Sequence, residues 1–158
     1  AGTSLRCALS CQMGAVRLAG QYSIRDHGDL SYVEEAARSI LLAGLESHPT
    51  LSMPEKWYGT GGTFTTLAAI VRQVHWTERT YMHGTVLTLR QVEQTARSLA
   101  DMPLELRREL PGLQPNRADI IVHGMCILLA CMRQMEIGEI IVSEYGNLEG
   151  YVRQAFCD

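Results

Sequence analysis

The residues best suited to chemistry form the run Gly59-Thr60-Gly61-Gly62-Thr63, which passes directly into a helical pattern of apolar residues. Glycine permits positive φ angles and carries no Cβ to hold a ligand away from the backbone. The free N–H groups and the positive dipole end of the following helix attract phosphate, and threonine hydroxyls add further donors. From the loop alone, two interpretations stay open: contact with a phosphate or nucleotide, or a tight structural turn that lets the helix pack closely on a sheet.

Standard nucleotide-binding and metal-binding patterns do not fit this chain. No Lys-Ser or Lys-Thr pair follows the last glycine, and Phe64 departs from the GxGxxG pattern. The five histidines and five cysteines show no metal-ligand spacing, and Cys126 and Cys131 would diverge on a helix. We therefore expect no metal site in this chain. We interpret His123 as a core histidine, and the following charged residues as solvated helix faces: Glu34, Glu35, Glu105, Arg107, Arg108 and Glu109.

Composition limits the class of protein. The chain has 158 residues, 46% of them apolar, and a formal net charge of −3, which predicts one compact domain. The mild acidity gives no basic surface for nucleic acid. The odd number of cysteines, without a CxxC pair, favours reduced thiols in a cytoplasmic protein. No signal peptide is visible, and the longest apolar stretch, residues 120–132, is shorter than the roughly 20 residues of a bilayer span.

The expected elements alternate between strands and helices, which predicts an α/β domain with helices covering a sheet. One or two strands are expected in residues 3–18, at most a short strand between residues 49 and 58, and a buried strand at residues 139–143. Helices are expected at residues 31–47, 63–74, 89–100, from 117 or 118 to about 135, and from 148 or later to 156, after a glycine turn at residues 145–150. The helix ending near residue 135 is apolar nearly all round, which indicates burial on most sides.

Three of these helices have candidate N-terminal caps. Ser31 with Glu34, and Thr88 with Gln91, form capping-box pairs, in which each side chain can bond a free N–H of the other residue. Thr63 stands where it could cap the helix after the glycines.

Four segments of the chain resemble the Ppx/GppA exopolyphosphatase and guanosine-pentaphosphate phosphohydrolase family. They are SCQMGAVRL (residues 10–18), GTGGTFTTLAAI (59–70), LPGLQPNRADIIVHGMCILLACM (110–132) and IIVSEYGNLEGYV (140–152). Their order and spacing are also similar to the family, and together they cover roughly the whole chain. The third segment is the most specific, with leucine-proline-glycine-leucine and then arginine-alanine-aspartate opening a long apolar helix.

The resemblance implies a fold and a site. The fold is a ribonuclease-H-like domain of the actin-like ATPase superfamily, with a mixed sheet and helices on both faces. Residues 1–158 would form one partial domain, the C-terminal part of the phosphatase core. Gly59, Thr60, Gly61, Gly62 and Thr63 would contact the phosphates of the substrate, which is inorganic polyphosphate or guanosine pentaphosphate. Mg²⁺ is implied for the intact family enzyme.

The chain also departs from the family. The first phosphate loop, the catalytic glutamate and an aspartate-x-glycine-glycine-glycine-serine loop are not found, so we expect no catalytic residue and no activity of the chain alone. Loss of a middle strand would leave an open sheet edge, so we expect a homodimer. Residues 146–150 read Gly-Asn-Leu-Glu-Gly, with Leu148 where the family has arginine. A non-catalytic ligand-sensing or scaffold domain of the same fold is therefore the alternative function.

Overall fold

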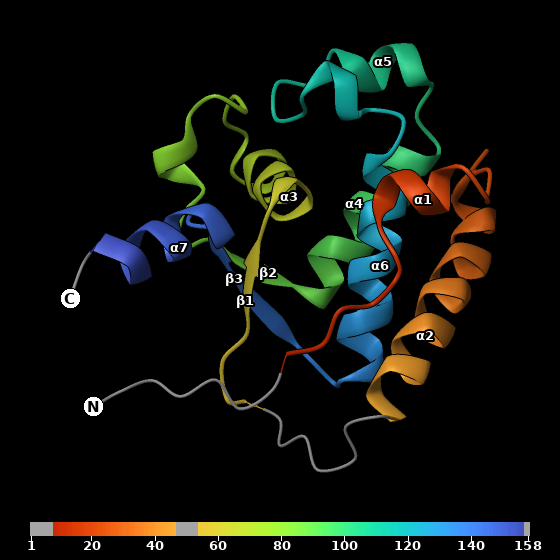
Figure 1. Ribbon diagram of the computed structural model, residues 1–158. Coiled ribbons are helices and arrows are strands. Elements are labelled where there is room, and N and C mark those ends of the chain that lie inside the picture. Colours follow the sequence, from red (N-terminus) through yellow and green to blue (C-terminus); the bar gives the residue numbers. More distant parts are fainter. Residues whose placement is uncertain (1–7, 47–53, 157–158) are drawn as a thin grey trace.

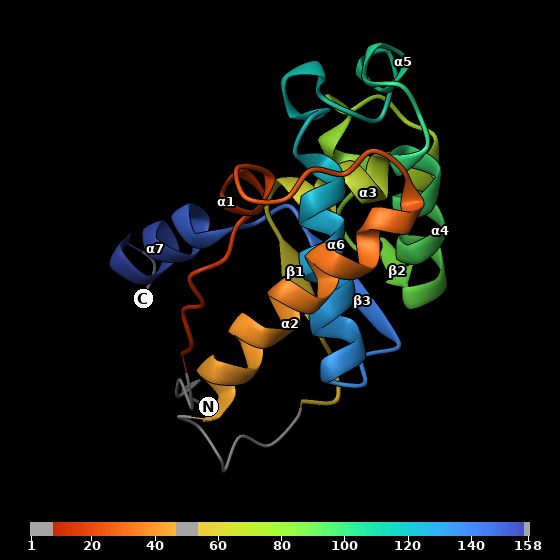
Figure 2. The ribbon, with the colours of Figure 1, turned by 90° about the vertical axis from the view of Figure 1, so that its right-hand side faces the viewer.

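The fold is a small three-stranded sheet packed against a group of helices (Figures 1 and 2). The computed structural model describes residues 8–46 and 54–156. Its strands are β1 (Tyr58–Thr60), β2 (Val86–Thr88) and β3 (Glu139–Ser143). Its α-helices are α1 (Ala15–Ala19), α2 (Leu30–Glu46), α3 (Gly62–Arg72), α4 (Leu89–Ala100), α5 (Leu104–Arg108), α6 (Ile121–Gln134) and α7 (Asn147–Phe156). Short 3₁₀ turns lie at η1 (His27–Asp29), η2 (Arg79–Tyr81) and η3 (Pro115–Arg117).

The sheet is mixed, as expected. Its strand order is β1-β3-β2, with β1 parallel and β2 antiparallel to the central strand β3. Gly59 pairs with Val142, and Leu87 pairs with Ile140. Because β1 and β3 are parallel, their carboxyl ends meet at one edge of the sheet, where β1 runs into α3 and β3 runs into α7 (Figure 1).

One face of the sheet carries the core. The side chains of Leu87, Ile140 and Val142 are buried, whereas Tyr58 and Val86 on the opposite face are 66% and 43% exposed. Helix α3 packs against all three strands, and α4 packs against β2. In the described part of the chain, α3 and α4 therefore cover the buried face of the sheet.

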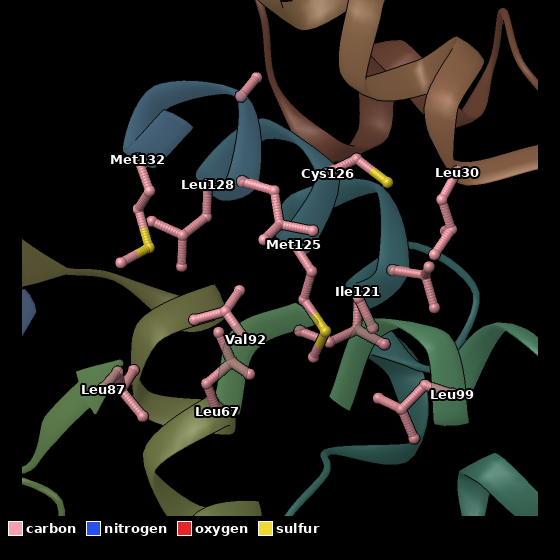
Figure 3. Close-up of a cluster of buried hydrophobic side chains, with 14 of the residues drawn as sticks. Leu30, Leu67, Leu87, Val92, Leu99, Ile121, Met125, Cys126, Leu128 and Met132 are labelled. Atoms are coloured by element: carbon pink, nitrogen blue, oxygen red, sulfur yellow. The ribbon is translucent and has the colours of Figure 1, made fainter. Parts of the chain in front are cut away.

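Helix α6 is the centre of the core, as its apolar sequence predicts. It packs against α2, α4 and α1, and Figure 3 shows its side chains interleaved with those of the neighbouring helices. Met125 and Cys126 are fully buried, and Leu128 is 5% exposed. His123 is also a core residue, as expected, because it is 5% exposed and its Nε2 lies 2.8 Å from the carbonyl oxygen of Tyr22.

Two predicted elements are confirmed almost to the residue. Helix α4 begins after Thr88, and the capping box is complete because the Thr88 side chain accepts from the Gln91 N–H and Gln91 Oε1 accepts from the Thr88 N–H. Strand β3 spans the residues expected, 139–143.

The N-terminal strands were predicted wrongly. Residues 15–19 form helix α1, no strand lies among residues 8–14, and residues 3–7 fall outside the described ranges. Helix α1 has five residues, of which only Leu18 is buried. A run this short shows no clear apolar period that would separate a helix from a strand.

Several helix starts also differ from the prediction. Helix α2 begins at Leu30, after a 3₁₀ turn in which the Asp26 side chain accepts from the Gly28 N–H, so Ser31 lies inside the helix and is no cap. Glu34 instead forms an ion pair with Arg133 of α6. Helix α3 begins at Gly62 with Gly61 as its N-cap, so Thr63 does not cap it.

The later part of the chain contains three further corrections. Helix α6 begins at Ile121, because residues 115–117 form the separate turn η3. Helix α7 begins at Asn147, so Gly150 lies within a helix and not in a turn. Strand β2 and helix α5 were not predicted as elements. Arg107 of α5 is 8% exposed, contrary to our interpretation of a solvated face, and donates to the carbonyl oxygens of Ala118 and Met102.

Candidate functional site

A pocket of about 530 Å³ opens at the carboxyl ends of β1 and β3. Four segments of the chain line it, and each lies at an end of an element or in a connection. They are the glycine loop with the start of α3 (Thr60, Gly61, Gly62, Thr65, Thr66), the connection between α3 and β2 (Trp76, Thr77, Arg79, Met82), the turn before α6 (Gln114, Arg117) and the end of β3 with the start of α7 (Glu144, Gly146, Glu149).

Two of the five predicted loop residues face the core and not this pocket. Gly59 is buried in β1, where an added Cβ would overlap the ring of Phe64. Thr63 lies against Gly124 of α6, where an added Cβ would overlap the Thr63 hydroxyl. These contacts show that the loop does serve as a close-packed structural turn, which was one of the two interpretations of the sequence.

The other three predicted residues line the pocket. Gly61 has a φ of +101° and a ψ of 177°, and a Cβ added there would meet no atom within 4 Å. A backbone with this φ favours glycine, and the open space beside it leaves the first N–H groups of α3 approachable. Thr60 is engaged within the protein, because its hydroxyl donates to the carbonyl oxygen of Tyr145 at 3.3 Å. Thr65 and Thr66, which were not predicted, line the same wall.

Arg117 brings a cation to the glycine loop. Its guanidinium lies so close to Gly62 that a Cβ at that residue would overlap Arg117 Nη1. The side chain is half-buried, and in the described part of the chain no hydrogen bond or ion pair to it is found. The absence of a side chain at Gly62 therefore seats an arginine beside the N-terminus of α3. The arginine-alanine-aspartate motif contained this residue, but its spacing from the loop, 55 residues along the chain, gave no sign of the contact.

Glu149 and Glu144 bring negative charge to the lining. Glu149 Oε2 accepts from the backbone N–H of Gly146 at 2.8 Å. This bond, together with the N–H of Glu149 itself and the charge of Arg79, holds the pKa of the Glu149 carboxyl below its usual range. Glu149 is therefore ionised at neutral pH and is occupied in capping α7, which makes it a poor general base.

The described residues of the pocket are not arranged as a metal site. Across residues 8–46 and 54–156, no group of three or more His, Cys, Asp or Glu side chains is arranged to hold an ion. Glu144 Oε2 is bonded to Arg79, and Glu149 Oε2 is bonded to backbone. The described side chains therefore do not fit the magnesium site that the resemblance implies for the intact enzyme.

No helix among residues 8–46 and 54–156 has the length and the apolar sequence needed to cross a bilayer.

Comparison with known proteins gives a consistent result. The sequence pattern of the Ppx/GppA phosphatase family matches residues 2–156. Exopolyphosphatase 2 of Mycobacterium tuberculosis is 27% identical over 148 residues, which cover 89% of this chain and 46% of that protein. The chain thus spans about half the length of the curated relatives that it matches.

Solved structures agree with the sequence match. A PPX-GPPA enzyme from Aquifex aeolicus superposes with a TM-score of 0.83 at 26% identity, over 96% of this chain and 50% of that chain. An exopolyphosphatase from Cytophaga hutchinsonii superposes with a TM-score of 0.73 at 23% identity, over 91% of this chain and 48% of that chain, which supports the fold. The fold is therefore ribonuclease-H-like, as in the actin-like ATPases. From its sequence match and its fold, the chain belongs to the Ppx/GppA phosphatase family.

Proposed function

We propose that the protein carrying this chain hydrolyses phosphoanhydride bonds of inorganic polyphosphate or guanosine pentaphosphate. Family membership and the likeness to Exopolyphosphatase 2 support this reaction. Within it, we propose that the chain contributes the surface that contacts the substrate phosphates. Because the chain spans about half of its relatives, we assign it binding and orientation of the substrate and no catalytic residue.

The observation that carries the proposal is that the open backbone at Gly61 and the guanidinium of Arg117 lie at the same helix N-terminus. Gly61 opens the N-terminus of α3 to the pocket, and Gly62 seats the Arg117 guanidinium beside it. Backbone N–H groups and a guanidinium together offer charge-assisted hydrogen bonds to phosphate oxygens. In the reaction, water attacks the terminal phosphorus, the bridging P–O bond breaks, the bridging oxygen departs with the shortened chain, and the attacked phosphoryl group is released as orthophosphate. The donors would hold the phosphoryl oxygens while negative charge shifts among them in the transition state.

Magnesium enters the proposal with the substrate. Mg²⁺ commonly keeps several waters and binds through substrate phosphates with one or two carboxylates. Since the described carboxylates do not form an ion site, the proposal assigns none of them as a magnesium ligand.

We further propose that the protein forms a homodimer in the cytoplasm. Strand β1 lies at an edge of the sheet and, within the described ranges, pairs only with β3. An edge strand offers unpaired N–H and C=O groups to a second chain. Light scattering should give twice the monomer mass, and a monomer at micromolar concentration would contradict this assembly.

The main test is phosphate release by the protein at its natural length, with Mg²⁺ and either polyphosphate or guanosine pentaphosphate. We expect the wild type to release orthophosphate and Gly61→Val to lose both turnover and binding of tripolyphosphate. Gly84→Val is the matched control, because Gly84 also has a positive φ, +77°, with open space around it, and does not line the pocket. Both variants place a β-branched side chain at a positive φ, so a loss specific to Gly61→Val supports phosphate contact.

The outcome also separates the alternative function. A ligand-sensing or scaffold domain would bind tripolyphosphate through Gly61 and Arg117 without releasing orthophosphate. The replacement of the expected arginine by Leu148 is the observation that favours this alternative. Absence of binding by the folded wild type would overturn both functions.

A further inference from the structure

Arg79 is a second cation in the lining of the same pocket, and it comes from a different segment of the chain than Arg117. It lies in η2, in the connection between α3 and β2, and its side chain is 70% exposed. Its Nε donates to Glu144 Oε2 at 2.7 Å. Arg79 is therefore fixed at one point near its end, although most of its surface is open to solvent.

Glu144, the residue that holds Arg79 in place, is an unusual partner because its carboxylate is nearly buried. The residue follows β3 directly, and its side chain is 10% exposed. Its Oε1 is buried and has no hydrogen-bond partner in the described part of the chain. Removing a carboxylate from water is costly unless a cation compensates it, so the bond from Arg79 holds the two side chains together.

The guanidinium geometry leaves donors available for a ligand. Arginine carries five N–H donors in a planar fork, of which the Nε–H of Arg79 is used by Glu144. Among the described residues, Nη1 and Nη2 of Arg79 make no hydrogen bond. Lysine would not present its donors in this planar fork, because its three N–H groups radiate from one nitrogen.

We propose that Arg79, positioned by Glu144, binds a second phosphoryl group of the substrate while Arg117 and the α3 N-terminus bind the first. This inference rests on the proposed function and adds a selectivity to it. Two cations supplied by separate segments of the lining favour a chain of phosphates over a single orthophosphate. Arg79 is thus the residue that discriminates between the polyphosphate substrate and the orthophosphate product.

The test measures binding of sodium tripolyphosphate and of orthophosphate by calorimetry, with the protein at its natural length. We expect Arg79→Ala to weaken tripolyphosphate binding about tenfold and to leave orthophosphate binding within a factor of two. Arg79→Lys should also weaken tripolyphosphate binding, because the ammonium will stay with Glu144. Arg108→Ala is the control for loss of charge, since Arg108 is exposed and does not line the pocket. Unchanged tripolyphosphate affinity in Arg79→Ala would overturn the inference.

A second variant excludes a purely structural role for Arg79. Arg79→Ala alone leaves the Glu144 carboxylate buried without its cation, and this could distort the pocket. The double variant Arg79→Ala/Glu144→Gln removes that charge. If the double variant still binds tripolyphosphate about tenfold more weakly than the wild type, Arg79 contacts the ligand. Recovery of wild-type affinity would show that Arg79 only neutralises Glu144, and would overturn the inference.

The results also separate this inference from the proposed function. Tripolyphosphate binding that is lost in Gly61→Val but kept in Arg79→Ala would leave the proposed function standing and the inference overturned. A folded wild type that binds no tripolyphosphate would overturn both.

Discussion

Gly59 and Thr63 face the core, whereas Gly61 and Gly62, which lie between them in the sequence, face the pocket. On the core side, the missing Cβ of Gly59 makes room for Phe64. On the pocket side, the missing Cβ of Gly62 makes room for Arg117. The same residue type therefore supports packing on one side of the loop and ligand access on the other. Substitutions on the core side should change stability, and those on the pocket side should change binding.

The largest effect is expected deep on the core side, in α6. Leu128→Ala removes a side chain that is 5% exposed, and should lower the free energy of unfolding by about 2–5 kcal/mol. Leu148→Ala is the matched control, because Leu148 of α7 is 72% exposed and should change stability by less than about 0.5 kcal/mol. Urea unfolding followed by circular dichroism measures both. A loss of about 2–5 kcal/mol in Leu148→Ala as well would show that α7 is covered in solution.

The next effect tests the core side of the loop itself. Gly59→Ala places a methyl group into the ring of Phe64 and should lower the free energy of unfolding by about 1–3 kcal/mol. Gly150→Ala is the control, since a Cβ at Gly150 in α7 meets no atom within 4 Å. If Gly59→Ala melts like the wild type and instead loses tripolyphosphate, Gly59 belongs to the pocket side and the division of the loop is wrong.

On the pocket side, Gly62→Ala should separate binding from stability. The new methyl group would displace the Arg117 guanidinium, the far end of a flexible side chain, so the fold has little to lose. Alanine also suits the first turn of α3 better than glycine does. We expect about tenfold weaker tripolyphosphate binding, equivalent to about 1.4 kcal/mol, with an unchanged or raised melting temperature.

The control for this variant is Gly138→Ala, because a Cβ there meets no atom within 4 Å and Gly138 does not line the pocket. If Gly62→Ala binds tripolyphosphate with the affinity of the wild type, Arg117 does not contact the ligand. A large loss of stability in Gly62→Ala would instead place Gly62 with Gly59 on the core side.

The sequence could predict the elements whose signals are local. Helix α4 was predicted because Thr88 and Gln91 carry their own cap, and α6 because its apolar residues run on every face. Helix α1 could not be predicted, because its five residues are too few to show a helical period. Strand β2 has three residues and depends on pairing with β3, which lies about 50 residues later in the chain.

The site shows the same limit. The glycine loop could be identified because its residue types are unusual, and three of its five predicted residues line the pocket. Which way each residue faces depends on Phe64 and Gly124, and the latter contact joins residues far apart in the chain. Arg79, Arg117 and Glu144 come together only through the fold, so no spacing in the sequence could reveal them.

The smallest effect concerns the core side at high pH. Burial, with a smaller contribution from Glu34, raises the pKa of the Cys126 thiol to about 12, and burial raises that of Cys131 to about 11. In the unfolded chain these thiols ionise near 8.5, so the unfolded state loses protons that the folded state keeps as the pH rises. The contribution of the two thiols to the free energy of unfolding is therefore fully present below about pH 8.5 and declines above it.

Between pH 8 and pH 9, each of the two thiols should lower the free energy of unfolding by less than about 1 kcal/mol. Urea unfolding at the two pH values measures the decline, and the double variant Cys126→Ala/Cys131→Ala isolates its source. The variant should be less stable at pH 8, because a cavity replaces one buried sulfur, yet its stability should fall less steeply with pH than that of the wild type. No cysteine is among the described residues that line the pocket, so tripolyphosphate affinity should be equal in the variant and the wild type at pH 8. An equal decline in both proteins would mean that water reaches these thiols, and that α6 is less closely packed than its burial indicates.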